Sequence, residues 1–138
     1  MAEILALDNP PVIFRVTQGV RSWNEQAALY AQGRTAPGVV VTNAQPGHSY
    51  HGFGLAVDVV PFDQKLPDWN RQHPIWQRLI EVGQFLGLEE GARWRSFPDF
   101  PHFQLTGRFP ASPDDEVRQI FLQAGTIGVW QESGLNGG

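Results

Sequence analysis

Hydrophobic residues recur along the chain with two periods, about every second residue and about every 3.6 residues, and the shorter period predicts strands. Residues 10–19, PPVIFRVTQG, set three apolar residues on one face, which is typical of a half-buried strand opened by prolines. Residues 55–60, LAVDVV, are apolar on both faces and predict a strand at the centre of its sheet. The segment PHFQL, residues 101–105, predicts a further short strand.

The longer period predicts three helices. In RSWNEQAALYAQG, residues 21–33, Ser22 precedes Glu25 by three residues and forms a capping box that starts a helix. The segment PIWQRLIEVGQFLG, residues 74–87, predicts a helix that ends at its last glycine. Its expected buried stripe consists of Ile75, Leu79, Val82 and Leu86. The segment SPDDEVRQIFLQAG, residues 112–125, opens with Ser, Pro and two acids, which is a strong helix-start pattern.

The remaining segments predict loops and an end that frays. Residues 34–47 are rich in turn residues, residues 62–74 follow a proline as a second loop, and residues 132–138, ESGLNGG, predict a flexible tail. Strands and helices are mixed, and the strands lie too close together for regular crossover units. We therefore expect one domain over residues 1–138 with an α+β fold, a small, mostly antiparallel sheet with flanking helices.

Composition narrows the classes of function. The chain has 138 residues, of which 41% are hydrophobic, enough to bury a core. Its net charge of -4 and the lack of a basic run argue against nucleic acid as a partner. The N-terminus, MAEILALDNPP, has neither the basic start nor the apolar run of a signal peptide, so we expect a soluble chain made in the cytoplasm and no membrane partner. Without cysteine, a metal site must use His, Asp or Glu.

One aspartate stands in an apolar strand and needs a cationic partner. An ionised Asp58 within LAVDVV costs several kcal/mol (on the order of 3 or more) unless it is paired or binds a metal. His51, in a glycine-flanked turn seven residues earlier, is one candidate partner, and His102 on the predicted strand is the best-placed third ligand for zinc. The structural alternative is a buried His–Asp hydrogen-bonded pair without metal. His48 in a turn and His73 beside a helix start fit solvated or capping roles better.

Three blocks of sequence resemble one family of zinc peptidases of bacterial cell walls, the D-alanyl-D-alanine carboxypeptidases and L-alanyl-D-glutamate peptidases. SYHGFGLAVD, residues 49–58, matches that family's SxHxxGxAxD pattern, and DFPHFQ, residues 99–104, resembles its catalytic acid and third zinc ligand. GVRSWNEQAALYAQGRT, residues 19–35, resembles the block around a substrate-binding arginine. A weaker likeness in IGVW extends the coverage to Trp130. The chain departs from the family at residues 89–94, where EEGARW stands in place of a block that often reads WGG before the tryptophan.

The resemblance implies a role for each matched residue. It implies that one Zn²⁺ ion is bound by His51, Asp58 and His102, that Asp99 is the general base and acid, and that Arg21 steadies a substrate carbonyl or oxyanion. Two further residues are implied to contact the substrate, namely Ser49 and Gln26. Structural alternatives remain for the last four: Asp99 as a turn acid, Arg21 as a helix-entry residue paired with Glu25, and Ser49 and Gln26 as local hydrogen-bonding residues.

The resemblance also implies a fold of the hedgehog and D-Ala-D-Ala-peptidase type and a function. It is closest to the short phage and bacterial L-alanyl-D-glutamate endopeptidases, many of them endolysins, so we expect hydrolysis of peptidoglycan stem peptides by a monomer. Such an enzyme, made in the cytoplasm, acts on the cell wall or periplasm after release or export. One alternative is a D-alanyl-D-alanine carboxypeptidase or dipeptidase. Another is a non-catalytic zinc-containing module that binds the cell wall or a protein.

Overall fold

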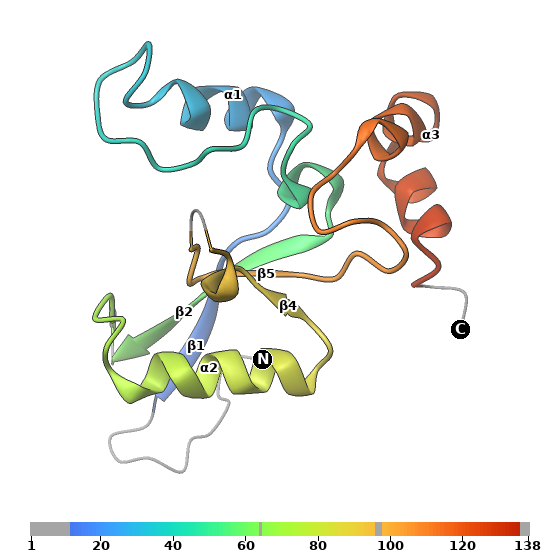
Figure 1. Cartoon of the computed structure of the whole chain (residues 1–138). Helices are drawn as coiled ribbons and strands as arrows, with labels where there is room; N and C mark the ends of the chain where they lie inside the picture. Colours follow the sequence, from blue (N-terminus) through green and yellow to red (C-terminus); the bar gives the residue numbers. More distant parts are fainter. Residues whose placement is uncertain (1–11, 64, 96–97, 136–138) are drawn as a thin grey trace. The chain divides into compact units, whose positions relative to one another are not determined.

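The chain forms two compact units in a computed structural model. The first unit consists of residues 1–19 and 57–105, and the second of residues 20–56 and 106–138. Each unit has a hydrophobic core of its own, so each is described by itself (Figure 1). The described residues are 12–63, 65–95 and 98–135. The prolines at positions 10 and 11, expected to open the first strand, lie outside them.

A five-stranded sheet forms the first unit, in the order β1-β2-β5-β4 with β3 paired to β2. Its strands are β1 (Val12–Gln18), β2 (Ala56–Asp63), β3 (Leu66–Pro67), β4 (Glu89–Glu90) and β5 (His102–Gln104). The pairs β1·β2, β2·β3 and β4·β5 are antiparallel. The expected α+β class with a small, mostly antiparallel sheet is therefore confirmed.

Strand β2 is central, as its apolar sequence on both faces predicted. It pairs with β1 on one side, and on the other the Val59 amide donates a 2.8 Å hydrogen bond to the Pro101 carbonyl oxygen, just before β5. The prediction of a loop from residue 62 was wrong, because β2 continues to Asp63 and the chain returns as β3. The physical reason is the ladder with β1, in which Ile13 lies opposite Phe62 and supplies pairing that the local sequence does not reveal.

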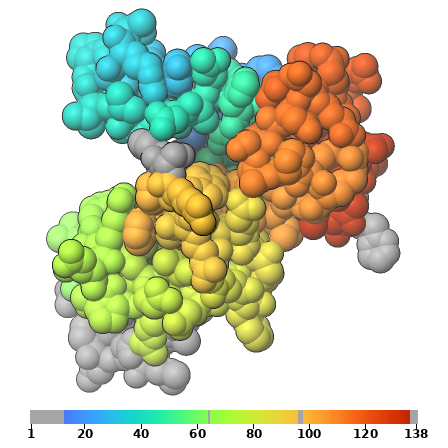
Figure 2. Space-filling view, in the orientation of Figure 1, coloured from blue at the N-terminus to red at the C-terminus, as the bar shows by residue number. Residues whose placement is uncertain are grey.

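Helix α2 (Pro74–Phe85) covers the core of the first unit. The core residues are Phe14, Val59, Val60, Ile75, Trp76, Leu79 and Phe103. The buried stripe is rotated from the one expected: Trp76 and Ile80 are buried, whereas Val82 is half-buried and Leu86 is 54% exposed. The helix stops as predicted before Gly87, whose positive φ of 82° suits glycine. Figure 2 shows the outer side of this helix (yellow-green) at the molecular surface.

The second unit contains α1 (Trp23–Ala31), the 3₁₀ turn η1 (Tyr50–Phe53) and α3 (Asp115–Ser133). The capping box at Ser22 is confirmed, since its hydroxyl accepts from the Glu25 amide and the Glu25 carboxylate accepts from the Ser22 amide. The core of this unit consists of Tyr50, Phe53, Ala56, Phe109, Val117 and Val129. Two of these core residues, Tyr50 and Phe53, belong to η1, the turn that contains the candidate ligand His51.

Helix α3 starts where the sequence predicted but runs further. The Asp114 carboxylate caps it by accepting from the Val117 amide. Gly125 has a non-helical conformation, and the helix resumes after this kink and continues to Ser133, two residues into the expected tail. The buried Val129 packs this second part into the core. Residues 136–138 lie outside the described residues. Among those described, no helix has the length and apolar character needed to span a membrane.

Candidate metal centre

The turn η1 holds His51 in a buried position. The Ser49 hydroxyl accepts a 3.3 Å hydrogen bond from the His51 amide and so caps the turn. Gly54 ends it with a φ of 72°, a left-handed conformation that a β-carbon disfavours, and directs the chain into β2. His51 is only 2% exposed to solvent. The carbonyl oxygen of His51 accepts a 2.9 Å hydrogen bond from the Arg21 amide, which fixes the turn beside the start of α1.

Asp58 lies on β2, and the sheet brings His102 next to it. The Asp58 side chain is 20% exposed, and the strand period places it on the face of Ala56 and Val60, which are both buried. Because Val59 is hydrogen-bonded to Pro101, the neighbouring residues Asp58 and His102 face one another across β2 and β5. The distance from Asp58 Oδ1 to His102 Nδ1 is 3.7 Å.

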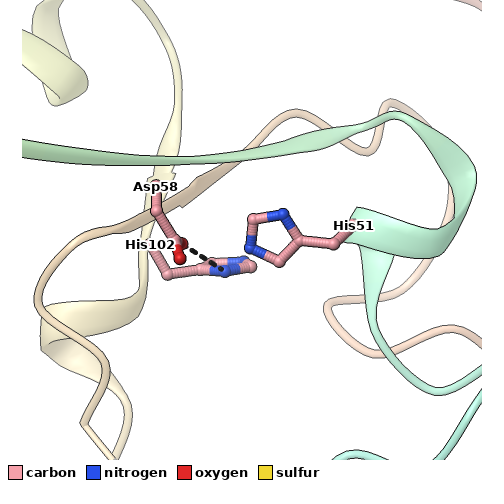
Figure 3. A group of neighbouring side chains, drawn as sticks. All are labelled: His51, Asp58 and His102. Carbon is pink, nitrogen blue, oxygen red and sulfur yellow. Dashed lines mark ion pairs between the residues drawn. The ribbon is translucent and has the colours of Figure 1, made fainter. Parts of the chain in front are cut away.

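The side chains of His51, Asp58 and His102 form a group that could hold a metal ion (Figure 3). One ligand atom from each residue lies within 4.8 Å of the other two. Only six residues separate His51 from Asp58, so the polypeptide itself keeps these two close. Two imidazoles and one carboxylate are borderline donors that suit zinc better than magnesium or calcium, which prefer oxygen alone. A cation among them also offsets the cost of burying a carboxylate.

Asp99 lies at the start of the turn that leads into His102. Its carbonyl oxygen accepts from the His102 amide at 3.1 Å, and its own amide donates to the Gly91 carbonyl oxygen at 2.9 Å. The residue is half-buried. The backbone therefore fixes the acid and the imidazole in one turn, as the two-residue spacing in DFPH suggested.

Arg21 and Gln26 are linked in the second unit. Arg21 Nη1 donates a 2.8 Å hydrogen bond to Gln26 Oε1, and Gln26 Nε2 donates to the Ala44 carbonyl oxygen at 2.7 Å. Gln26 is only 2% exposed, and the oxygen and the nitrogen of its side-chain amide are both used in these hydrogen bonds. Glu25, the ion-pair partner considered for Arg21, takes part in the capping box. Hydrogen bonds from Ser22 hold the pKa of Glu25 below its ordinary value, and the nearby charge of Arg21 contributes least.

The other two histidines have the roles expected from their positions. His73 caps α2, because its Nδ1 accepts a 3.2 Å hydrogen bond from the Ile75 amide. His48 is exposed in a turn. Neither belongs to the group of three candidate ligands.

Three residues beside His102 were not singled out as functional from the sequence. Gln104 Oε1 lies 2.8 Å from His102 Nε2, and Gln104 Nε2 donates to Glu89 Oε2 at 3.2 Å. Trp94 Nε1 donates to the same carboxylate oxygen at 3.0 Å. The alternation of β5 could have indicated Gln104, since it shares a face with His102, but the contributions of Glu89 and Trp94 depend on pairing across the sheet.

The chain is similar to a protein family, to a curated protein and to a solved structure. Residues 42–105 match a family described as D-alanyl-D-alanine carboxypeptidase. The peptidoglycan L-alanyl-D-glutamate endopeptidase CwlK of Bacillus subtilis (strain 168) is 37% identical over 98 residues, covering 65% of this chain and 59% of that protein. The chain thus spans less than two thirds of this curated relative. The crystal structure of the Serratia marcescens L-Ala D-Glu endopeptidase ChiX is 28% identical with a TM-score of 0.48, covering 69% of this chain and 68% of that one.

Proposed function

We propose that the chain is a member of the D-alanyl-D-alanine carboxypeptidase family, which it matches over residues 42–105, and that it is a zinc-dependent peptidase that hydrolyses stem peptides of peptidoglycan. The observation that carries the proposal is the convergence of His51, Asp58 and His102. The activity of CwlK, an L-alanyl-D-glutamate endopeptidase, supports the bond between L-alanine and D-glutamate as the one cut. Because the matched segment, residues 42–105, continues from the second unit into the first, we infer that the chain acts as one catalytic domain, and as a monomer on its polymeric substrate.

In the proposed reaction the three ligands bind the metal ion and Asp99 transfers protons. His51, Asp58 and His102 would hold the ion, which when bound supplies Lewis acidity: it polarises a carbonyl and makes water acidic enough to react near neutral pH. Asp99 takes the proton of the attacking water and delivers it to the leaving amine, because a carboxylate on a half-buried turn can serve first as base and then as acid. The backbone hydrogen bond from the His102 amide to the Asp99 carbonyl oxygen supports this role, because it links the acid to a proposed metal ligand.

Arg21 supplies a fixed positive charge for the substrate. Its backbone is hydrogen-bonded to His51, so the guanidinium originates from a residue adjoining a metal ligand. The buried Gln26 holds the guanidinium through the 2.8 Å hydrogen bond, and Ser49 holds His51 by capping η1. We infer that Arg21 contacts a substrate carbonyl or its oxyanion, and that Gln26 and Ser49 act at the substrate site chiefly by positioning these two residues.

Digestion of a defined stem peptide tests the function. Cleavage that yields a new N-terminal D-glutamate, is lost with a chelator and is restored by zinc supports the proposal. Release of D-alanine instead would favour the carboxypeptidase activity that gives the family its description. A chain that binds zinc and wall fragments without cleaving them would be a binding module, and the proposed function would be wrong.

Substitution of Asp99 separates catalysis from metal binding. Asp99→Ala should bind zinc as the wild type does and lose turnover by about 10²-fold or more, because the proton transfers lose their carrier. Asp63→Ala is the matched control, since Asp63 is an exposed acid at the end of β2. Full activity of Asp99→Ala would contradict the role given to this carboxylate.

A further inference from the structure

The imidazole of His102 is the first member of a chain of hydrogen-bonded side chains in the first unit, which continues from two buried residues to two half-buried ones. Its Nε2 lies 2.8 Å from Gln104 Oε1, and both residues are nearly inaccessible, at 3% and 2% exposure. Gln104 Nε2 then donates to Glu89 Oε2, and Glu89 and Gln104 are register partners in the β4·β5 ladder. Trp94 Nε1 donates to the same oxygen of Glu89, and the Trp94 ring lies 4.8 Å from the His102 ring between centroids.

The hydrogen bonds of these side chains indicate which nitrogen of His102 carries the proton. Gln104 Nε2 donates to Glu89 Oε2, so the group of Gln104 that faces this carboxylate is the NH₂. The amide oxygen of Gln104 consequently faces His102 and requires a donor there, which places the proton on Nε2. In the neutral ring the lone pair is then on Nδ1, the atom that lies 3.7 Å from Asp58 Oδ1. A lone pair and a carboxylate oxygen repel one another unless a cation lies near both.

We propose that Gln104, Glu89 and Trp94 form an outer shell that sets the tautomer and orientation of His102, so that Nδ1 is presented to the metal ion. This inference rests on the proposed function for the ion itself. A hydrogen bond to the non-ligating ring nitrogen fixes the ring and makes the ligating nitrogen a better donor. Here the negative charge of Glu89 acts on His102 through the Gln104 amide, and burial keeps water from weakening the link.

The three residues have separable roles in this shell. Gln104 is the relay, because it contacts both the imidazole and the carboxylate. Glu89 supplies the charge. Trp94 holds Glu89 by its indole N–H and limits the movement of the His102 ring by contact. All three are positioning residues. They lie on β5, on β4 and directly after the 3₁₀ turn η2 (Gly91–Arg93), and two of them belong to EEGARW, the block in which this chain departs from the family pattern.

Zinc affinity, measured by titration against a competing chelator, tests the proposal. Gln104→Leu keeps the size of the side chain and removes the relay, so affinity should fall by about 10- to 100-fold. Glu89→Gln keeps an oxygen that can accept from Trp94 and Gln104 but removes the negative charge, so zinc affinity should fall by less. Gln84→Leu is the matched control, since Gln84 is an exposed glutamine of α2 in the same unit, and its affinity should be unchanged. Wild-type affinity in folded Gln104→Leu would overturn the proposal.

The tautomer can be read directly by NMR of the metal-free wild-type protein. The ¹⁵N shifts of the His102 ring should show the proton on Nε2, and Gln104→Leu or Glu89→Gln should weaken that preference. A proton on Nδ1 in the wild type would overturn the proposal even if Gln104→Leu does not fold. Failure of the proposed function is distinguishable: a wild-type protein that binds no zinc contradicts that function, whereas one that binds zinc and cleaves wall peptides regardless of Gln104 contradicts only the outer shell.

Discussion

Replacing Gly91 with alanine would push this residue and the turn that holds Asp99 and His102 apart. A β-carbon at this position would lie 2.9 Å from His102 Cβ and 3.1 Å from Asp99 Cβ, and closer still to the Asp99 carbonyl oxygen. Ordinary van der Waals contacts begin near 3.4 Å, so the backbone must move by about half an ångström or more. The strain of such overpacking is about 1–3 kcal/mol, and a displacement of about 1 Å at reacting groups can reduce a rate by about 100-fold.

Gly91→Ala should therefore weaken zinc binding and lower kcat/KM by about 10- to 100-fold while the protein still folds. The assays are chelator competition for zinc, hydrolysis of a defined stem peptide and thermal unfolding. Gly19→Ala is the control, because a β-carbon at Gly19 meets no atom within 4 Å and its φ lies outside the left-handed region. If Gly91→Ala keeps wild-type zinc affinity and activity, the tight packing of Asp99 and His102 against this glycine has no functional consequence, and the reasoning fails.

Three further substitutions test the fold that supports the site. Leu79→Ala should lower the free energy of unfolding by about 2–5 kcal/mol in urea denaturation, because this leucine is 3% exposed in the first core; a loss under about 1 kcal/mol would contradict its core role. Gly54→Ala should destabilise by about 1–3 kcal/mol in thermal unfolding, since its φ is +72° and the added carbon would lie 2.8 Å from the Trp130 ring; an unchanged Tm would refute this. Ser22→Ala should raise the pKa of Glu25 in an NMR titration: the backbone hydrogen bond from residue 22, the larger cause of the lowered pKa, can remain, but the side-chain hydrogen bond is lost. Since that pKa is lowered by folding, the stabilisation is present above the unfolded-state pKa and is lost as pH falls through the folded value.

Local patterns in the sequence were sufficient for several elements. The Ser22 capping box, the glycine that ends α2 and the acidic start of α3 all act within a few residues, so their effects do not depend on distant parts of the chain. The apolar faces of β2 indicated a central strand for the same reason. The spacing of His51, Asp58 and His102 named three candidate ligands, and the structure brings them together.

Long-range pairing decided what the sequence could not. The extension of β2 to Asp63 comes from its ladder with β1. The buried stripe of α2 includes Trp76 because this residue packs into one core with residues of the strands. Helix α3 resumes after Gly125 because Val129 has a core to enter.

The surroundings of the site depend on the same kind of contact. Glu89 and Gln104 are fifteen positions apart and meet only as partners across two short strands, so no local period reveals that they share a hydrogen bond. The sequence by itself determined which side chains have the chemistry to bind a metal and to move a proton. Only the tertiary structure decided what surrounds His102, because the pairing of β4 with β5 brings Glu89 to Gln104, whose amide oxygen lies 2.8 Å from His102 Nε2.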